Sequence, residues 1–102
     1  MKRVVITGIG VVSAIGNNTG DFWASLKAGR TGIGPITKVP TDDLRFKSAG
    51  EVRGFDATEH FDDKALLWLD PFSHFGIVAA RQAIADSGIE FDDALCDRTG
   101  VI

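Results

Sequence analysis

The chain has 102 residues, of which 44% are apolar and 25% charged, and its formal net charge is −3. The length fits one domain, and the composition is that of a folded rather than a disordered protein. The negative charge excludes the broad basic field of nucleic-acid-binding proteins, and no stretch approaches the ~18 apolar residues that span a bilayer. The single cysteine excludes an intrachain disulfide and fits a reducing compartment.

The first half of the chain predicts one buried strand and one helix. Residues 3–16 are rich in valine, isoleucine and glycine, which predicts a buried strand and then a loop. Asn17-Asn18-Thr19 provides a helix cap, and the helix is expected to end at Gly29. Residues 32–35 have the composition of a turn, and a single short strand is predicted near residues 48–53.

The second half predicts a longer helix between two shorter features. Asp56 and Glu59 are spaced as in a capping box, and a helical piece is predicted over residues 62–69. Asp70-Pro71 starts a helix that is expected to stop at Gly88. Its apolar residues fall on one broad stripe, made of Phe72, Phe75, Ala79, Ala83 and Ile84.

The C-terminal residues are predicted to form an acidic loop, over residues 90–97, and the opening of a buried strand, over residues 98–102. Chain ends are normally polar and frayed. An apolar ending of this kind is typical of a segment of a longer protein, and we expect the same here.

The glycines of Gly8-Ile9-Gly10 follow the predicted first strand, as those of a dinucleotide-binding fingerprint do. Ser13 stands where that fingerprint needs a third glycine or an alanine, and no second strand with an acidic end follows about 20 residues later. We therefore expect no nucleotide cofactor at these glycines. A structural role remains, in which they let the strand bend or pack closely.

Three other residues have reactive side chains but unsuitable neighbours. Cys96 lies in the acidic loop beside Asp97, whereas a nucleophilic cysteine needs a positive environment. His60 and His74 lie 14 residues apart, with no ligand-like spacing and no cysteine pair nearby. The sequence therefore predicts no catalytic residue and no metal site.

Leu66-Leu67-Trp68-Leu69 places four large apolar residues in a row. A helix cannot turn four consecutive side chains toward one core. Either this helix is buried on several sides within a larger protein, or these residues, with Lys64 beside them, form a partner or subunit contact. Both interpretations stay open at this point.

The succession of motifs closely resembles the start of the β-ketoacyl-acyl carrier protein synthases, the elongating condensing enzymes of fatty-acid synthesis. The resemblance covers essentially the whole chain. The matching residues run from Met1-Lys2-Arg3-Val4-Val5-Ile6-Thr7-Gly8-Ile9-Gly10 through Gly16-Asn17, Phe22-Trp23, Gly29-Arg30-Thr31-Gly32-Ile33, Ala49-Gly50-Glu51-Val52, Leu69-Asp70-Pro71-Phe72 and Asp86-Ser87-Gly88 to Arg98-Thr99-Gly100-Val101.

The resemblance implies a thiolase-like α/β fold, of which residues 1–102 would be a single, incomplete domain within the N-terminal half. It implies a homodimeric acyltransferase that performs a decarboxylative Claisen condensation with a nucleophilic cysteine and two histidines. None of these catalytic residues matches a position of this chain, so the chain alone is expected to be inactive.

The resemblance also implies a partner, acyl carrier protein, which the family binds partly through basic residues before its long helix. In the matching residues 62–69 only Lys64 keeps the charge, which weakens this expectation. Two functions remain open: the N-terminal part of a condensing synthase, or a non-catalytic module or inactive paralogue that pairs with a full-length synthase. A synthase relative that acts as a chain-length or initiation partner is not separated from the first, because the position that decides it is absent from this chain. In both cases we expect self-association or association with the remainder of the parent protein.

Overall fold

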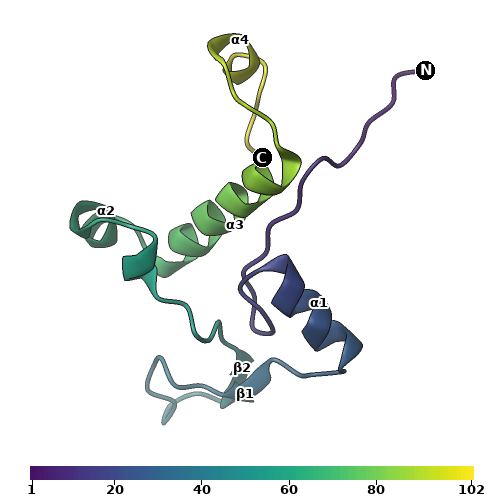
Figure 1. Ribbon diagram of the computed structural model, residues 1–102. Helices are drawn as coiled ribbons and strands as arrows, with labels where there is room; N and C mark the ends of the chain where they lie inside the picture. The colour runs from purple at the N-terminus through teal and green to yellow at the C-terminus, as the bar shows by residue number, and fades with distance from the viewer.

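The computed structural model describes residues 1–102 as a set of short elements around one long helix (Figure 1). The N-terminal segment passes along this helix, α3, while α2 lies beyond its N-terminal end and α4 beyond its C-terminal end. The elements, in chain order, are α1 (Thr19–Lys27), β1 (Ile33–Pro35), β2 (Ser48–Gly50), the 3₁₀ turn η1 (Ala57–Glu59), α2 (Asp63–Trp68), α3 (Pro71–Ser87) and α4 (Asp93–Cys96).

Helix boundaries follow the caps that the sequence provides. The Asn18 side chain accepts a hydrogen bond from the Asp21 N–H at 2.9 Å, and Asp62 accepts one from the Ala65 N–H at 2.8 Å. Pro71 occupies the first turn of α3, and Gly88 ends this helix with a φ of 65°, a conformation that glycine adopts without steric cost. These predicted starts and stops are confirmed.

Both predicted buried strands are wrong for this structure. Residues 3–12 form no strand, and Val4 is 95% exposed and Ile6 84% exposed. The loop predicted after them is present as a turn that an isolated bridge between Ser13 and Gly16 closes. Residues 98–102 likewise form no strand, and the Val101 side chain is fully exposed. A strand exists only when a second strand completes its hydrogen bonds, and neither segment has one.

Two further expectations differ from the structure. Residues 32–35, predicted as a turn, include β1, which pairs antiparallel with β2 so that Ile33 lies opposite Gly50. The acidic loop contains α4 instead, because the Asp92 side chain accepts a hydrogen bond from the Leu95 N–H at 2.7 Å and so caps a helical turn. The short strand predicted near residues 48–53 is confirmed at Ser48–Gly50.

The chain does not close a core. Its accessible surface is 8,447 Å², whereas a folded monomer of this mass exposes about 5,600 Å². The radius of gyration is 16.9 Å, against about 13 Å for a compact domain of this length. Val78, 5% exposed, is the only buried apolar residue, and no side chain is fully buried. The chain is therefore held together by separate contacts, such as those of the N-terminal segment and of His60 with α3 and those between β1 and β2, rather than by a shared interior.

The apolar stripe of α3 is covered only in part. The backbone of the N-terminal segment lies on Ala79 and Ala83, and the ring of Phe75 meets that of Phe55 edge-on, with 5.0 Å between centroids. Phe72 and Ile84, at the two ends of the stripe, stay exposed. Cover of this stripe thus comes from segments before α3, which the sequence analysis did not foresee.

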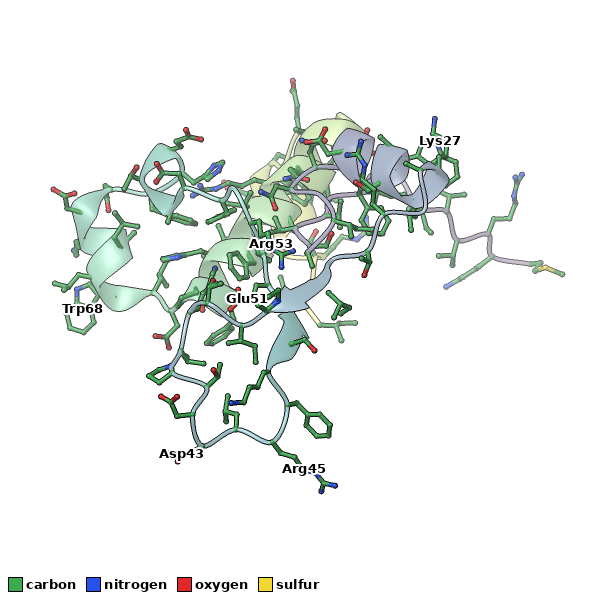
Figure 2. All side chains as sticks on the ribbon, turned by 90° about the horizontal axis from the view of Figure 1, so that it is seen from below. Lys27, Asp43, Arg45, Glu51, Arg53 and Trp68 are labelled. Atoms are coloured by element: carbon green, nitrogen blue, oxygen red, sulfur yellow. The ribbon has the colours of Figure 1, made fainter.

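Glu51 closes the loop that joins β1 to β2. Its carboxylate accepts hydrogen bonds from the Thr37 N–H at 3.0 Å, the Thr37 hydroxyl at 2.9 Å and the Lys38 N–H at 3.1 Å. These donors, the Thr37 N–H first, hold the pKa of Glu51 below its ordinary value of 4.5. The loop beyond this clamp carries Asp43 and Arg45 outward (Figure 2).

Candidate functional site

One face of α2 exposes large apolar side chains. Asp62 caps the helix. Within the helix, Leu66 is half-buried, whereas Leu67 and Trp68 face the solvent. Leu67 is 81% exposed and Trp68 77% exposed, and Figure 2 shows Trp68 at the edge of the molecule. The run Leu66–Leu69 therefore does not face one core, as its helical spacing predicts.

A shallow hollow lies along this face. It encloses about 510 Å³ and is lined by Asp62, Lys64, Ala65, Trp68 and Leu69. Lys64 is the single cation among residues 62–69, which also contain two aspartates and four large apolar residues. The charge of this stretch is therefore not complementary to an acidic partner. The exposed Leu67 and Trp68 beside the hollow give it the apolar character of a binding surface.

An aromatic cluster anchors the segment that carries α2. The His60 ring stacks on Phe55 with 5.2 Å between centroids, and the Phe61 ring lies 4.8 Å from that of His74. The guanidinium of Arg81 lies over the Phe61 ring at 5.1 Å and donates a hydrogen bond to the His60 carbonyl at 2.9 Å. These contacts fix residues 55–61 on α3 and leave the exposed face of α2 free.

The two histidines are thus brought close to one aromatic cluster but not to a ligand set. His74 is 7% exposed and its Nε2 has no hydrogen-bond partner, while His60 is exposed. No group of three His, Cys, Asp or Glu side chains is arranged to hold a metal ion. Cys96 lies exposed at the end of α4, far along the chain from both histidines.

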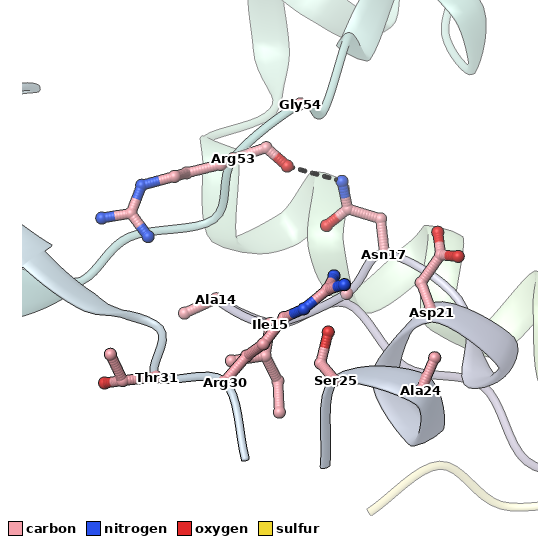
Figure 3. A pocket seen from close by; sticks show the side chains of 11 residues that line it. Ala14, Ile15, Asn17, Asp21, Ala24, Ser25, Arg30, Thr31, Arg53 and Gly54 are labelled. Carbon is pink, nitrogen blue, oxygen red and sulfur yellow. Dashed lines mark hydrogen bonds between the residues drawn. The ribbon is translucent and has the colours of Figure 1, made fainter. Parts of the chain in front are cut away.

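A second, polar hollow of about 500 Å³ lies between the residue 14–17 turn, α1 and the segment around Arg53 (Figure 3). The Asn17 side-chain N–H₂ donates to the Arg53 carbonyl at 2.7 Å, and the Arg53 guanidinium donates to the Gly32 carbonyl at 3.0 Å. Both arginines that line it, Arg30 and Arg53, share it with the Asp21 carboxylate. These bonds join three segments of the chain, and the hollow holds no pair of groups suited to proton transfer.

The glycines of the N-terminal segment serve close packing. A Cβ at Gly8 would collide with the Ala83 carbonyl oxygen and lie 2.8 Å from the Ser87 nitrogen. A Cβ at Gly10 would collide with the Ala79 carbonyl oxygen. The structural interpretation of these glycines, by close packing, is confirmed. Neither has a positive φ, and no helix begins directly after them as a pyrophosphate site requires.

Two polar residues of α3, to which the sequence analysis assigned no role of their own, hold the same segment. Gln82 and Asp86 accept hydrogen bonds from the backbone N–H groups of Val11 and Ile9, at 3.0 and 2.9 Å. Their spacing of four residues places both side chains on one helix face. In the sequence, two polar residues four positions apart beside the apolar stripe of a helix were the signal that could have indicated this contact.

The arrangement of segments around α3 has a known counterpart. Residues 1–102 match the family described as "Beta-ketoacyl synthase, N-terminal domain". The chain belongs to this family. The resemblance read from the order of sequence motifs is therefore confirmed, together with the thiolase-like fold class that it implies.

Relatives named as synthases align with nearly the whole of this β-ketoacyl synthase segment. It is 43% identical over 101 residues to "3-oxoacyl-[acyl-carrier-protein] synthase 2" of Synechocystis sp. and 43% identical over 100 residues to the protein of the same name from Coxiella burnetii. These alignments cover 99% and 98% of the chain but 24% of each relative. The chain thus spans about a quarter of the length of these relatives.

A solved structure shares the arrangement. "The ishigamide ketosynthase/chain length factor" superposes with a TM-score of 0.75 and 35% sequence identity, covering 90% of this chain and 23% of that one. This β-ketoacyl synthase segment accordingly matches the N-terminal region of its relatives. No helix in the structure has the length and apolar character needed to cross a membrane.

Proposed function

We propose that this chain is the N-terminal portion of a 3-oxoacyl-acyl carrier protein synthase, an acyltransferase that extends fatty acids by decarboxylative Claisen condensation. The observation that carries the proposal is the alignment of 99% of the chain with the N-terminal region of a synthase at 43% identity. Such identity over a continuous segment supports a shared role for that segment.

Within the synthase, this portion supplies scaffold rather than reacting groups. A condensing site needs an activated nucleophile and donors for the developing oxyanion. Cys96 ends α4, which lies beyond the C-terminal end of α3, whereas His74 lies in the first turns of α3 (Figure 1). No hydrogen bond in the structure pairs Cys96 with a base. The chain contributes α3, the helices beside it and an extended apolar segment onto which strands of a central sheet can pair. Residues 1–102 then form one incomplete domain within the N-terminal half.

The partners of the whole protein follow from the same proposal. Its substrates are acyl and malonyl groups carried by acyl carrier protein, it acts as a homodimer, and it works in the cytoplasm. Docking of the acidic carrier protein at α2 has little support from charge, because Lys64 is the only cation of that face. We assign carrier-protein docking mainly to the rest of the protein.

A segment exchange tests the proposal. The chain replaces the matched 101 residues of the Synechocystis relative, and condensation of acyl with malonyl carrier protein is measured. We expect the exchanged enzyme to fold as a dimer and to retain condensing activity within about tenfold of the relative, whereas the chain alone turns over nothing. A folded, dimeric exchange enzyme without condensation would contradict the proposal. A matched exchange carrying Gly10→Val, which cannot pack on α3, serves as the negative control.

The second candidate function is a non-catalytic module that pairs with a full-length synthase. The exposed Leu67 and Trp68 and the hollow beside them favour it, because an exposed apolar patch usually marks an interface. The intact mass of the protein from its native source discriminates between the two. A species of 10.9 kDa supports the module, and a species about four times larger supports the synthase.

A further inference from the structure

The N-terminal segment and α3 match each other in two parallel rows of contacts. In the first row, Gly8 lies against Ala83 and Gly10 against Ala79. In the second, the Ile9 N–H donates to Asp86 and the Val11 N–H donates to Gln82. In each row a step of two residues along the segment corresponds to a step of four residues along the helix.

The geometry of the two backbones explains this correspondence. Two residues of extended chain advance about 6.6 Å, and four residues of α-helix advance about 6.0 Å. An extended segment that runs antiparallel to a helix therefore meets the same helix face at every second residue. Alternation of side-chain direction places Gly8 and Gly10 on one face of the segment, so the face without side chains lies on the helix.

We propose that Gln82 and Asp86 are positioning residues that lock the register in which the N-terminal segment crosses α3. The proposal goes beyond the condensing function proposed above and stands independently of it. Gln82 holds the segment at two points, because both the oxygen and the nitrogen of its side-chain amide form hydrogen bonds with it. Its Oε1 accepts from the Val11 N–H at 3.0 Å, and its Nε2 donates to the Asn17 carbonyl at 2.7 Å.

The hydrogen bonds of Gln82 and Asp86 select one register of the N-terminal segment on α3 among those that its apolar side chains alone would allow. A shift by two residues would bring Ile6 or Val12 to a place where only a glycine fits. A shift by one residue would turn every side chain of the segment to its other face. The glycines exclude these registers by collision, whereas Gln82 and Asp86 favour the observed one by satisfying two N–H groups that otherwise lack partners.

Amide hydrogen exchange of the full chain, resolved by residue, tests the lock. In the unaltered chain we expect the Ile9 and Val11 amides to exchange at least tenfold more slowly than in an unstructured peptide. Gln82→Met should accelerate exchange at Val11 about tenfold with less effect at Ile9. Asp86→Leu should do the reverse. If the variants only destabilised α3 as a whole, each would accelerate exchange equally at Ile9 and Val11. The diagnostic result is therefore that each variant accelerates mainly the amide to which its own side chain was bonded.

Asp86→Asn is the matched control, since its amide oxygen still accepts a hydrogen bond and should keep the Ile9 rate within about threefold. Unprotected Ile9 and Val11 amides in the unaltered chain would overturn the proposal, as would variants that leave both rates unchanged. If Gln82→Met unfolds the chain, the unaltered chain and the pair Asp86→Asn and Asp86→Leu still decide the question.

Discussion

Gly10 lies so close to α3 that the Cβ it lacks would overlap the carbonyl oxygen of Ala79. This carbonyl belongs to the helix backbone and cannot rotate away as a side chain could. The contact makes Gly10 the most constrained position of the N-terminal segment, and it leads to a direct stability test.

Gly10→Ala should lower the free energy of unfolding by about 1–3 kcal/mol, the usual cost of overpacking, with Gly8→Ala acting in the same direction. The control is Gly76→Ala in the interior of α3, where a Cβ meets nothing within 4 Å. There alanine should stabilise by about 0.5–1 kcal/mol. Urea unfolding measures all three. Equal stability of Gly10→Ala and the unaltered chain would refute the close contact.

The same glycines should bind no nucleotide. NAD or ATP at concentrations up to millimolar should leave the thermal midpoint unchanged, because a ligand at 100 times its Kd would stabilise by about 2.7 kcal/mol and would be seen. The absence of a helix directly after Gly10 is the physical reason. A saturable shift at micromolar NAD or ATP would restore the cofactor interpretation.

Glu51 should make the β1–β2 loop sensitive to acid. Its pKa is held below the ordinary value of 4.5 by hydrogen bonds from Thr37, so its stabilising contribution is complete above that value and is lost as the pH falls through the lower, folded-state pKa. Amide exchange at Thr37 and Lys38 should accelerate in that acid window. Glu51→Gln should abolish the acid transition, while Asp43→Asn, in the exposed loop tip, should preserve it. A transition that survives in Glu51→Gln would assign the effect to another group.

Cys96 should not accept an acyl group. It is exposed at the end of α4, next to Asp97, and no histidine stands beside it in the sequence to act as the base that activates a nucleophilic cysteine. After incubation with acyl-acyl carrier protein, the intact mass should be unchanged. Cys96→Ser provides the matched blank. Stoichiometric transfer that disappears in Cys96→Ser would overturn the assignment of Cys96 as a spectator.

The isolated chain should associate with itself. Its surface exceeds that of a folded monomer by about half, and burial of apolar surface contributes roughly 25 cal/mol per Å². The unpaired segment around Val5 and the exposed Leu67 and Trp68 are among the surfaces available for contact. Sedimentation across a wide concentration range should show oligomers of the unaltered chain. If the chains associate through the α2 face, the double variant Leu67→Ser/Trp68→Ser should form fewer oligomers at the same concentration. A compact monomer that unfolds cooperatively at high concentration would contradict the expectation.

The sequence by itself determined the local structure and the family. Asn18, Asp62 and Asp92 cap helices because their short side chains reach N–H groups two or three residues ahead, although the cap at Asp92 was read only as an acidic loop. Pro71 and Gly88 bound α3 through their own φ preferences. These effects depend on neighbours along the chain, so a reader of the sequence can find them.

Only the tertiary structure decided what each apolar or polar face meets. The segment around Val5 has the composition of a buried strand, but pairing needs a distant partner, and here its neighbour is α3. The need for glycine at position 10 likewise arises from its contact with Ala79. The hydrogen bonds of Gln82 go to Val11 and Asn17, which lie 71 and 65 residues before it in the sequence. Contacts between residues so far apart depend on how the chain returns on itself, which local patterns do not encode.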